Sequence, residues 1–188
     1  MLDTTQCIER NRKRGNIRHE VDRDLEYKLL TEEIEETRQA IDSNDLEEII
    51  DWCIDILYVL CGTMWKSWVH IVAIQWMYEF VREKTDKQDP KTLIDTITQH
   101  VTREAIPYFW EYERADLYFR TIDILKSYWL TNDHIQQARQ AVCDNNDKKG
   151  SKKNKDGKIQ KNKNHEKPDF SKIIEEITKK IESSKKAD

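Results

Sequence analysis

Two helices joined by a short polar turn are encoded by residues 25–60, which read LEYKLLTEEIEETRQAIDSNDLEEIIDWCIDILYVL. Apolar residues recur in each half at the three- and four-residue spacing that marks one face of an α-helix. They are Leu25, Leu29, Leu30, Ile34 and Ile41, and then Leu46, Ile49, Ile50, Cys53, Ile54, Leu57 and Leu60. We predict a first helix that begins near Asp22 or Asp24, a turn at 42–45, and a second helix that ends near Gly62.

The rest of the chain also favours helices. Only 4 Gly and 3 Pro occur among 188 residues, and this scarcity of turn residues excludes a sandwich, a barrel and a collagen-like repeat. Further helices are predicted at 65–84, 91–106, 108–130, 133–143 and 170–181. From 144 to 168 almost no apolar residue occurs, so no packed core can form there alone. The predicted fold class is all-α.

Charge, cysteine spacing and hydropathy limit which compartments and partners are expected for the protein. Residues 144–188 hold 14 Lys against 9 acidic residues, so a net charge of +5 in this part leaves −9 for residues 1–143. The 4 cysteines and 5 histidines show no zinc-site spacing, and no signal peptide is recognised. The apolar run at 56–78 is interrupted before it reaches the ~18 residues of a membrane span. We expect a cytoplasmic protein (in the host cytoplasm if viral) with no membrane partner.

Acidic residues cluster on the two helices predicted within 25–60. They are Glu32, Glu33, Glu35 and Glu36 on the first, and Glu47, Glu48, Asp51 and Asp55 on the second. At helical spacing the first set shares one edge, and the last three of the second set form a single stripe. Antiparallel packing would bring the two sets face to face, where a hard divalent cation such as Mg²⁺ would relieve their repulsion, bridge phosphates and activate water. Solvated acidic helix faces are the alternative, although the apolar neighbours of Asp55 favour a metal site.

These acidic motifs resemble the signature of the MazG-type nucleotide pyrophosphohydrolases, EExxE on one helix and ExxD on the next. The branch related to phosphoribosyl-ATP pyrophosphohydrolase, common in phages, is more similar, because its second motif reads D-x-x-x-D-[IL]-x-Y-V with a Gly-Thr soon after. The resemblance covers about 24–64 and 138–176. The matching residues are Lys28, 32–36, Asp51, Asp55, Tyr58, Val59, Gly62 and Thr63, then Val142, Asn146, Lys149, 156–158, Lys161 and 168–170.

The resemblance implies an α-helical MazG-like bundle with an extra helical insert at about 65–132 and a Lys-rich C-terminal arm. In this interpretation 1–143 form the catalytic domain with its insert, and 144–188 complete the same domain. The insert would cover the bundle or extend a subunit interface.

The implied activity is hydrolysis of a nucleoside triphosphate to the monophosphate and pyrophosphate, in nucleotide-pool cleansing, by a homodimer or homotetramer. The implied cofactor is Mg²⁺, with Mn²⁺ as a substitute. The implied metal ligands are Glu33, Glu36, Asp51 and Asp55. The implied catalytic residues are Glu32 and Glu33. The implied substrate contacts are Lys28, Tyr58, Asn146, Lys149 and Lys158.

One residue departs from the family pattern, because Trp52 stands where the ExxD motif has its Glu. Asp51, on the same face as Asp55, is expected to take the ligand role, while Trp52 packs in the bundle or lines a base pocket. The alternative is a catalytically degenerate helical interaction or RNA-binding protein. Nucleic acid is not expected as a partner, since the Lys-rich stretch 148–167 lacks interleaved aromatics and clustered Arg.

Overall fold

The computed structural model describes residues 22–66, 88–101, 111–148 and 166–185, and within these ranges all regular secondary structure is α-helical. The all-α prediction is confirmed for them. The helices are α2 (Arg23–Ser43), α3 (Leu46–Lys66), α5 (Pro90–His100), α6 (Glu111–Ser127), α7 (Asn132–Lys148) and α8 (Ser171–Lys185). Most of the helix expected at 65–84 lies outside the described residues. No described helix combines the length and the apolar character needed to cross a membrane.

Local capping explains where α2 and α3 begin and end. The Asp22 side chain accepts a hydrogen bond of 3.0 Å from the backbone N–H of Leu25, so α2 begins at the expected place. Asn44 closes α2 in a left-handed conformation with φ of 52°, which an asparagine tolerates. Asp45 then caps α3 through the backbone N–H of Glu48.

Two sequence predictions for this hairpin are corrected by the structure. The turn is shorter than expected, because α2 continues through Ser43 and only Asn44 and Asp45 separate the helices. The second helix does not end near Gly62 but continues to Lys66. Its buried face continues past that glycine, because Thr63 remains buried.

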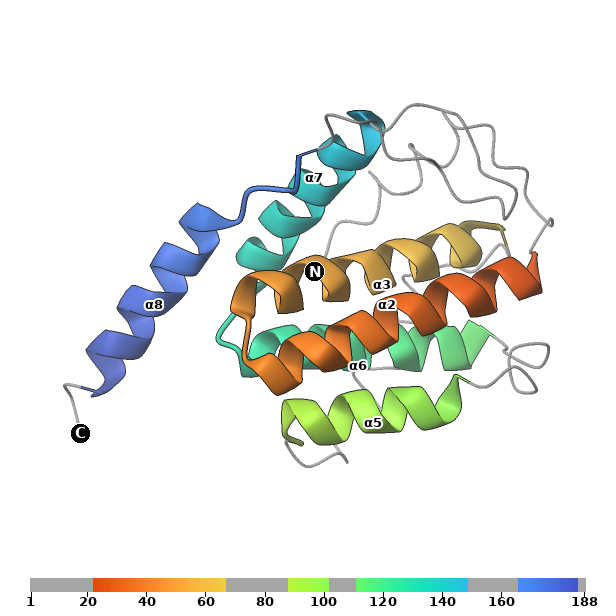
Figure 1. Cartoon of the computed structure of the whole chain (residues 1–188), viewed down its shortest axis with the longest axis horizontal. Helices are drawn as coiled ribbons and strands as arrows, with labels where there is room; N and C mark the ends of the chain where they lie inside the picture. Colours follow the sequence, from red (N-terminus) through yellow and green to blue (C-terminus); the bar gives the residue numbers. More distant parts are fainter. Residues whose placement is uncertain (1–21, 67–87, 102–110, 149–165, 186–188) are drawn as a thin grey trace.

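Helices α2, α3, α6 and α5 form a ring in which each packs against the next and α5 returns to α2 (Figure 1). The ring therefore combines the acidic hairpin α2–α3 with two helices from the part of the chain interpreted as an insert. Helix α7 also packs on α3 and crosses it on the face away from α5. This arrangement makes α3 the central helix of the molecule.

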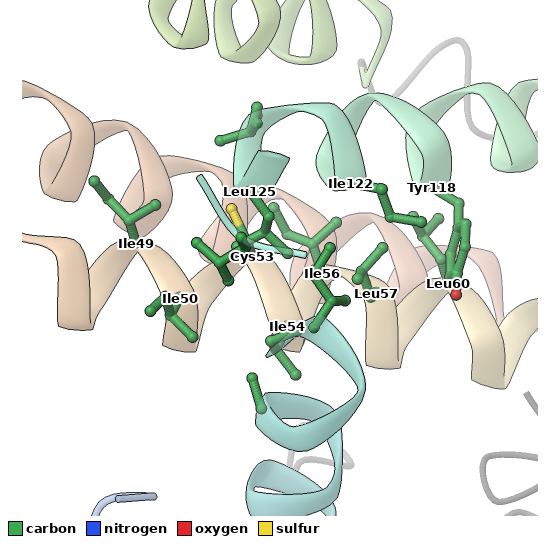
Figure 2. Packing of buried hydrophobic residues seen from close by; sticks show 14 of the residues in the cluster. Ile49, Ile50, Cys53, Ile54, Ile56, Leu57, Leu60, Tyr118, Ile122 and Leu125 are labelled. Atoms are coloured by element: carbon green, nitrogen blue, oxygen red, sulfur yellow. The ribbon is translucent and has the colours of Figure 1, made fainter. Parts of the chain in front are cut away.

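The core lies around α3 and contains almost every apolar side chain of that helix. Three residues of α6, Tyr118, Ile122 and Leu125, lie along one side of α3 (Figure 2). Ile54 points away from them, toward α7. Because three helices cover α3, its stripe of acidic residues is confined to the strip of surface that these helices leave.

A buried ion pair ties α2 to α6. Arg114 donates from Nε and Nη2 to the two carboxylate oxygens of Glu26, each at 2.8 Å. The two side chains are only 3% and 2% exposed. Two parallel hydrogen bonds between planar groups fix orientation as well as distance, so this pair sets how α6 lies against the first turns of α2.

Helix α7 is longer than the sequence predicts. It was expected to end at Cys143, but it continues to Lys148, and Asn145 and Asn146 are buried on it. Arg139 is buried on the same helix and donates to Tyr118 Oη of α6 at 3.3 Å and to Cys61 Sγ of α3 at 3.9 Å. Polar residues thus occupy much of the buried face of α7, and a pattern of apolar residues alone misses its last turn.

Three other helices differ from their predicted bounds. Helix α6 ends at Ser127 rather than at residue 130. Helix α5 ends at His100, with Val101 as its cap, rather than near residue 106. Helix α8 begins one residue later than predicted, where Asp169 accepts a hydrogen bond of 2.9 Å from the backbone N–H of Ser171. It extends to Lys185, four residues beyond the predicted end. Phe170, Ile173 and Ile177 bury one face of α8 in the shared core.

Candidate active site

Helix α2 places its glutamates at different depths. Glu33 is buried, with an exposed fraction of 6%, whereas Glu32 and Glu36 are half-buried. Burial of Glu33 follows from its position beside Leu30 and Ile34, which face the core. A carboxylate held at the edge of the core is a better ligand or proton acceptor than one on the open surface, since less water competes for it.

Helix α3 also places its acidic residues at different depths. Asp51 is buried, with an exposed fraction of 9%, and Asp55 and Glu48 are half-buried. The helix is continuous from Leu46 to Lys66, so these residues keep the predicted spacing along one side. Because α2 and α3 pack directly against each other, the two acidic sets lie on neighbouring helices.

The donor chemistry of this hairpin suits a hard divalent cation, because carboxylate oxygens are the ligands that Mg²⁺ prefers. Among the described residues, however, no group of three or more His, Cys, Asp or Glu side chains is gathered closely enough to hold a metal ion. The acidic side chains therefore lie on adjacent helices without converging on one point in this conformation. Binding a metal there requires these side chains to move together.

Trp52 lies where the helix geometry predicts. Its side chain is half-buried and packs against the hydrophobic core rather than joining the acidic stripe. Asp51, and not Trp52, thus takes the acidic position in this turn of α3. This placement agrees with the expectation that residue 52 packs in the bundle, while the ligand role of Asp51 stays a prediction.

The residues predicted to contact substrate are dispersed. Lys28 is exposed on α2 and Tyr58 is half-buried on α3. Asn146 is buried on α7, the helix that crosses α3. Lys149 and Lys158 lie outside the described residues.

A lysine that the sequence did not single out lies beside the acidic stripe. Lys167, three residues before the buried Phe170, contacts Glu48 Oε1 through its ammonium group. The hydrogen bond with Glu48, followed by the charges of Asp51 and Glu47, raises the pKa of Lys167. The available signal for Lys167 was its position immediately before the Pro-Asp that precedes the last helix. No local sequence pattern predicts its contact with Glu48, which is 119 positions away.

The three described cysteines are buried thiols. Burial raises the pKa of Cys53 far above neutrality, so its reactive thiolate form is suppressed. Cys61 and Cys143 are also buried, and neither forms a disulfide. The three cysteines act as small core residues, as the sequence predicted for Cys53 and Cys61.

Residues 9–75 match the family model of phosphoribosyl-ATP pyrophosphohydrolase. This segment, about a third of the chain, is similar to that family. No curated protein and no solved structure matches the chain. The predicted family resemblance is confirmed for this segment, and the match indicates a hydrolase of the pyrophosphohydrolase type. Within the described residues the matched segment contains the α2–α3 hairpin, and α5, α6, α7 and α8 lie beyond it.

Proposed function

We propose that the chain is a Mg²⁺-dependent nucleoside triphosphate pyrophosphohydrolase that converts an NTP or dNTP and water to the monophosphate and pyrophosphate. The proposed role is cleansing or adjustment of the nucleotide pool. The proposed assembly is a homodimer or homotetramer, with Mn²⁺ able to replace Mg²⁺.

The observation that carries the proposal is the placement of both acidic motifs on adjacent packed helices inside the segment that matches the family. Glu33 and Asp51 are the buried members of the two sets. Carboxylate oxygens on two packed helices are the type of ligand that Mg²⁺ prefers. Ligation of a cation that carries the substrate phosphates is the role that best fits their chemistry.

In the proposed reaction a water oxygen forms a bond to the α-phosphorus, and the bond from that phosphorus to the pyrophosphate oxygen breaks. The bound cation, held by Glu33, Glu36, Asp51 and Asp55, would neutralise phosphate charge. Glu32, half-buried beside Glu33, would accept the proton of the attacking water. No covalent nucleophile is required, which agrees with the suppressed thiolate of Cys53.

The test is pyrophosphate release by the full chain over a panel of NTPs, dNTPs and phosphoribosyl-ATP, with and without Mg²⁺. Release that depends on the cation supports the proposal, and the panel identifies the base and the sugar. A rise in the melting temperature with Mg²⁺ or Mn²⁺ and nucleotide is expected, because a ligand that binds only the folded state stabilises it.

The second candidate is a binding protein that has lost catalysis, favoured by Trp52 in place of the motif Glu. It predicts nucleotide binding, or RNA binding by the basic arm, without any release of pyrophosphate. Inactivity over the whole panel would therefore select this candidate over the enzyme.

A further inference from the structure

The four helices of the ring form two pairs with the same arrangement. Helix α2 packs on α3, and α5 packs on α6. The ring closes where α2 packs on α5 and where α3 packs on α6, so each helix contacts its counterpart in the other pair (Figure 1). An exchange of the two pairs therefore leaves the pattern of helix contacts unchanged.

Helices α2 and α5, the first members of the two pairs, pack antiparallel. Asp42, near the end of α2, pairs with Lys91 in the first turn of α5 at 2.9 Å. One turn earlier on α2, Arg38 donates a hydrogen bond of 2.7 Å to the hydroxyl of Thr98, near the end of α5. The order of these contacts shows that the two helices run in opposite directions.

Helices α3 and α6, the second members, also run in opposite directions. Early in α6, Tyr118 accepts a hydrogen bond from Arg139, which also donates to Cys61, late in α3. Further along α6, Leu125 lies toward Cys53, which precedes Cys61 on α3 (Figure 2). Antiparallel contacts between both sets of counterparts are what a two-fold rotation of one pair onto the other produces.

The sequence repeats at the contact of α3 with α6. Ile-Asp-Ile-Leu occurs at 54–57 and again at 122–125. With these two copies aligned, the three positions of the α3 acidic stripe are occupied in α6 by Asp116, Phe119 and Asp123. The outer two positions are therefore acidic in both helices, while the middle one is apolar in α6.

Neither pair can bury its apolar face alone, because a pair of helices is only one layer. In α5, Leu93, Ile94 and Ile97 are buried, and in α2, Leu30 and Ile34 are buried. All five belong to one core. The face of α2/α3 thus fits a helix pair with the same arrangement as its own, which describes both α5/α6 and a second copy of α2/α3.

We propose that α5/α6 is a divergent internal copy of α2/α3 and occupies the place that the α2/α3 pair of a second chain would take. The four-helix bundle is then complete in one chain, and any homodimer or homotetramer forms through another surface. Under the proposed function, on which this last point rests, the bundle has one reactive side. Helix α5 contains no glutamate, and Phe119 replaces the middle carboxylate of the stripe.

The first test determines whether one chain or two build the contact of α2 with α5. The full chain carries Asp42→Cys and Lys91→Cys, which replace two exposed, paired side chains, with Cys7→Ser to leave only buried native thiols. A short bismaleimide should link the two new thiols within one chain, at 22.6 kDa. Single variants that are mixed, unfolded and refolded together should give no linked product of twice that mass.

The matched control for this link is Lys28→Cys with Lys91→Cys. Lys28 is also exposed on α2, but it lies about 21 Å along the helix from residue 42. A short reagent should therefore not join it to residue 91. A link in this control would show that the reagent reports unfolding rather than the contact.

The second test determines whether the face of α2/α3 accepts a second copy when α5 is released. Ile97→Asp places a charge at a fully buried position of α5 and should detach that helix from α2. Arg38→Cys is the reporter, because α2 of a second chain would then cross this position. Chains should link through residue 38 in the double variant but not in Arg38→Cys alone. Gln99→Asp, at an exposed position of α5, is the matched control and should give no link.

Two results overturn the inference. One is a linked dimer from the refolded mixture, because two chains would then build the bundle. The other is an Ile97→Asp variant that keeps its helical circular dichroism but does not link through residue 38. If Ile97→Asp does not fold, the refolded mixture decides alone. Neither test uses nucleotide, so inactivity over the nucleotide panel refutes the proposed function and leaves the internal copy standing.

Discussion

Helices α3 and α6 carry the same four residues, Ile-Asp-Ile-Leu, at 54–57 and at 122–125. In both copies the two isoleucines and the leucine are buried and the aspartate is half-buried. The two helices pack against each other, so both copies contribute to one core (Figure 2). The shared residues therefore determine the same packing in two different helices.

The neighbours of the two aspartates differ. One turn before Asp55 lies Asp51, so α3 has two carboxylates on one side of the helix. One turn before Asp123 lies Phe119, which is buried, and the nearest acidic residue, Asp116, is paired with Arg120 at 2.6 Å. The Ile-Asp-Ile-Leu sequence alone therefore does not predict a reactive aspartate, because the neighbouring residues differ. Under the proposed function, the carboxylates of α3 take part in the reaction and α6 supports the fold.

The largest expected effect is on stability and comes from α6. Arg114→Met leaves Glu26 buried without its bidentate partner, and breaking such a pair costs about 3–5 kcal/mol in the free energy of unfolding. Urea denaturation monitored by circular dichroism measures it. The double variant Glu26→Leu with Arg114→Met should lie much closer to the wild type, because two apolar side chains leave no buried charge. A loss below about 1 kcal/mol for the single variant would show that α6 does not depend on this pair.

The next effect separates the two aspartates by activity. Asp55→Ala should abolish pyrophosphate release, with at most a tenth of wild-type activity left, a change of about 1.4 kcal/mol or more. The fold should persist, because Asp55 is half-buried and alanine is the better helix former. Asp123→Ala is the matched control from the same local sequence and should keep full activity. Equal losses in both variants would remove the distinction between α3 and α6.

A smaller effect concerns Trp52. Trp52→Glu restores the usual family motif but directs a carboxylate at the core, so it should cost about 1–3 kcal/mol of stability without raising activity. Trp52→Phe should keep the cation dependence. Asp51→Asn, in contrast, should lose most activity with little change in the melting temperature. Faster turnover by Trp52→Glu, or full activity of Asp51→Asn, would contradict the ligand assignment on α3.

The sequence predicted the local features well and the distant contacts poorly. Asp22 caps α2 and Asp45 caps α3 through backbone N–H groups three positions away, so both helix starts can be inferred from spacing. The Glu26–Arg114 pair joins residues 88 positions apart, and only the packing of α2 on α6 creates it. The extension of α7 was missed for another reason, since polar side chains such as Asn146 occupy its buried face.

The smallest expected effect concerns two non-glycine residues of the described chain that follow a helix in the left-handed conformation. Asn44 closes α2 with φ of 52°, and Trp129 follows α6 with φ of 70°. The backbone N–H groups of Trp129 and Leu130 bond to carbonyls of the last turn of α6, which is the pattern that normally takes glycine. A tryptophan there carries a conformational cost of about 1–2 kcal/mol that asparagine largely avoids.

What offsets this cost at Trp129 is a contact with α8. The indole is 45% exposed, and the Lys180 ammonium lies 5.8 Å from the ring centroid. A cation–π contact at an exposed site contributes about 0.5–1 kcal/mol. Trp129→Gly removes the strain and the contact together and gives the unfolded chain more freedom, so the free energy of unfolding should change by less than about 1 kcal/mol.

A double-mutant cycle separates the backbone strain at Trp129 from its contact with Lys180. Lys180→Met should cost about 0.5 kcal/mol in the wild type and close to nothing in the Trp129→Gly background, because the ring is already absent. Trp129→Asn should be slightly more stable than the wild type, since asparagine suits the left-handed position that it already occupies at residue 44. A loss of more than about 2 kcal/mol in Trp129→Gly would show instead that the indole is a main anchor of α8, and that the end of α6 supports the C-terminal helix more strongly than its exposure indicates.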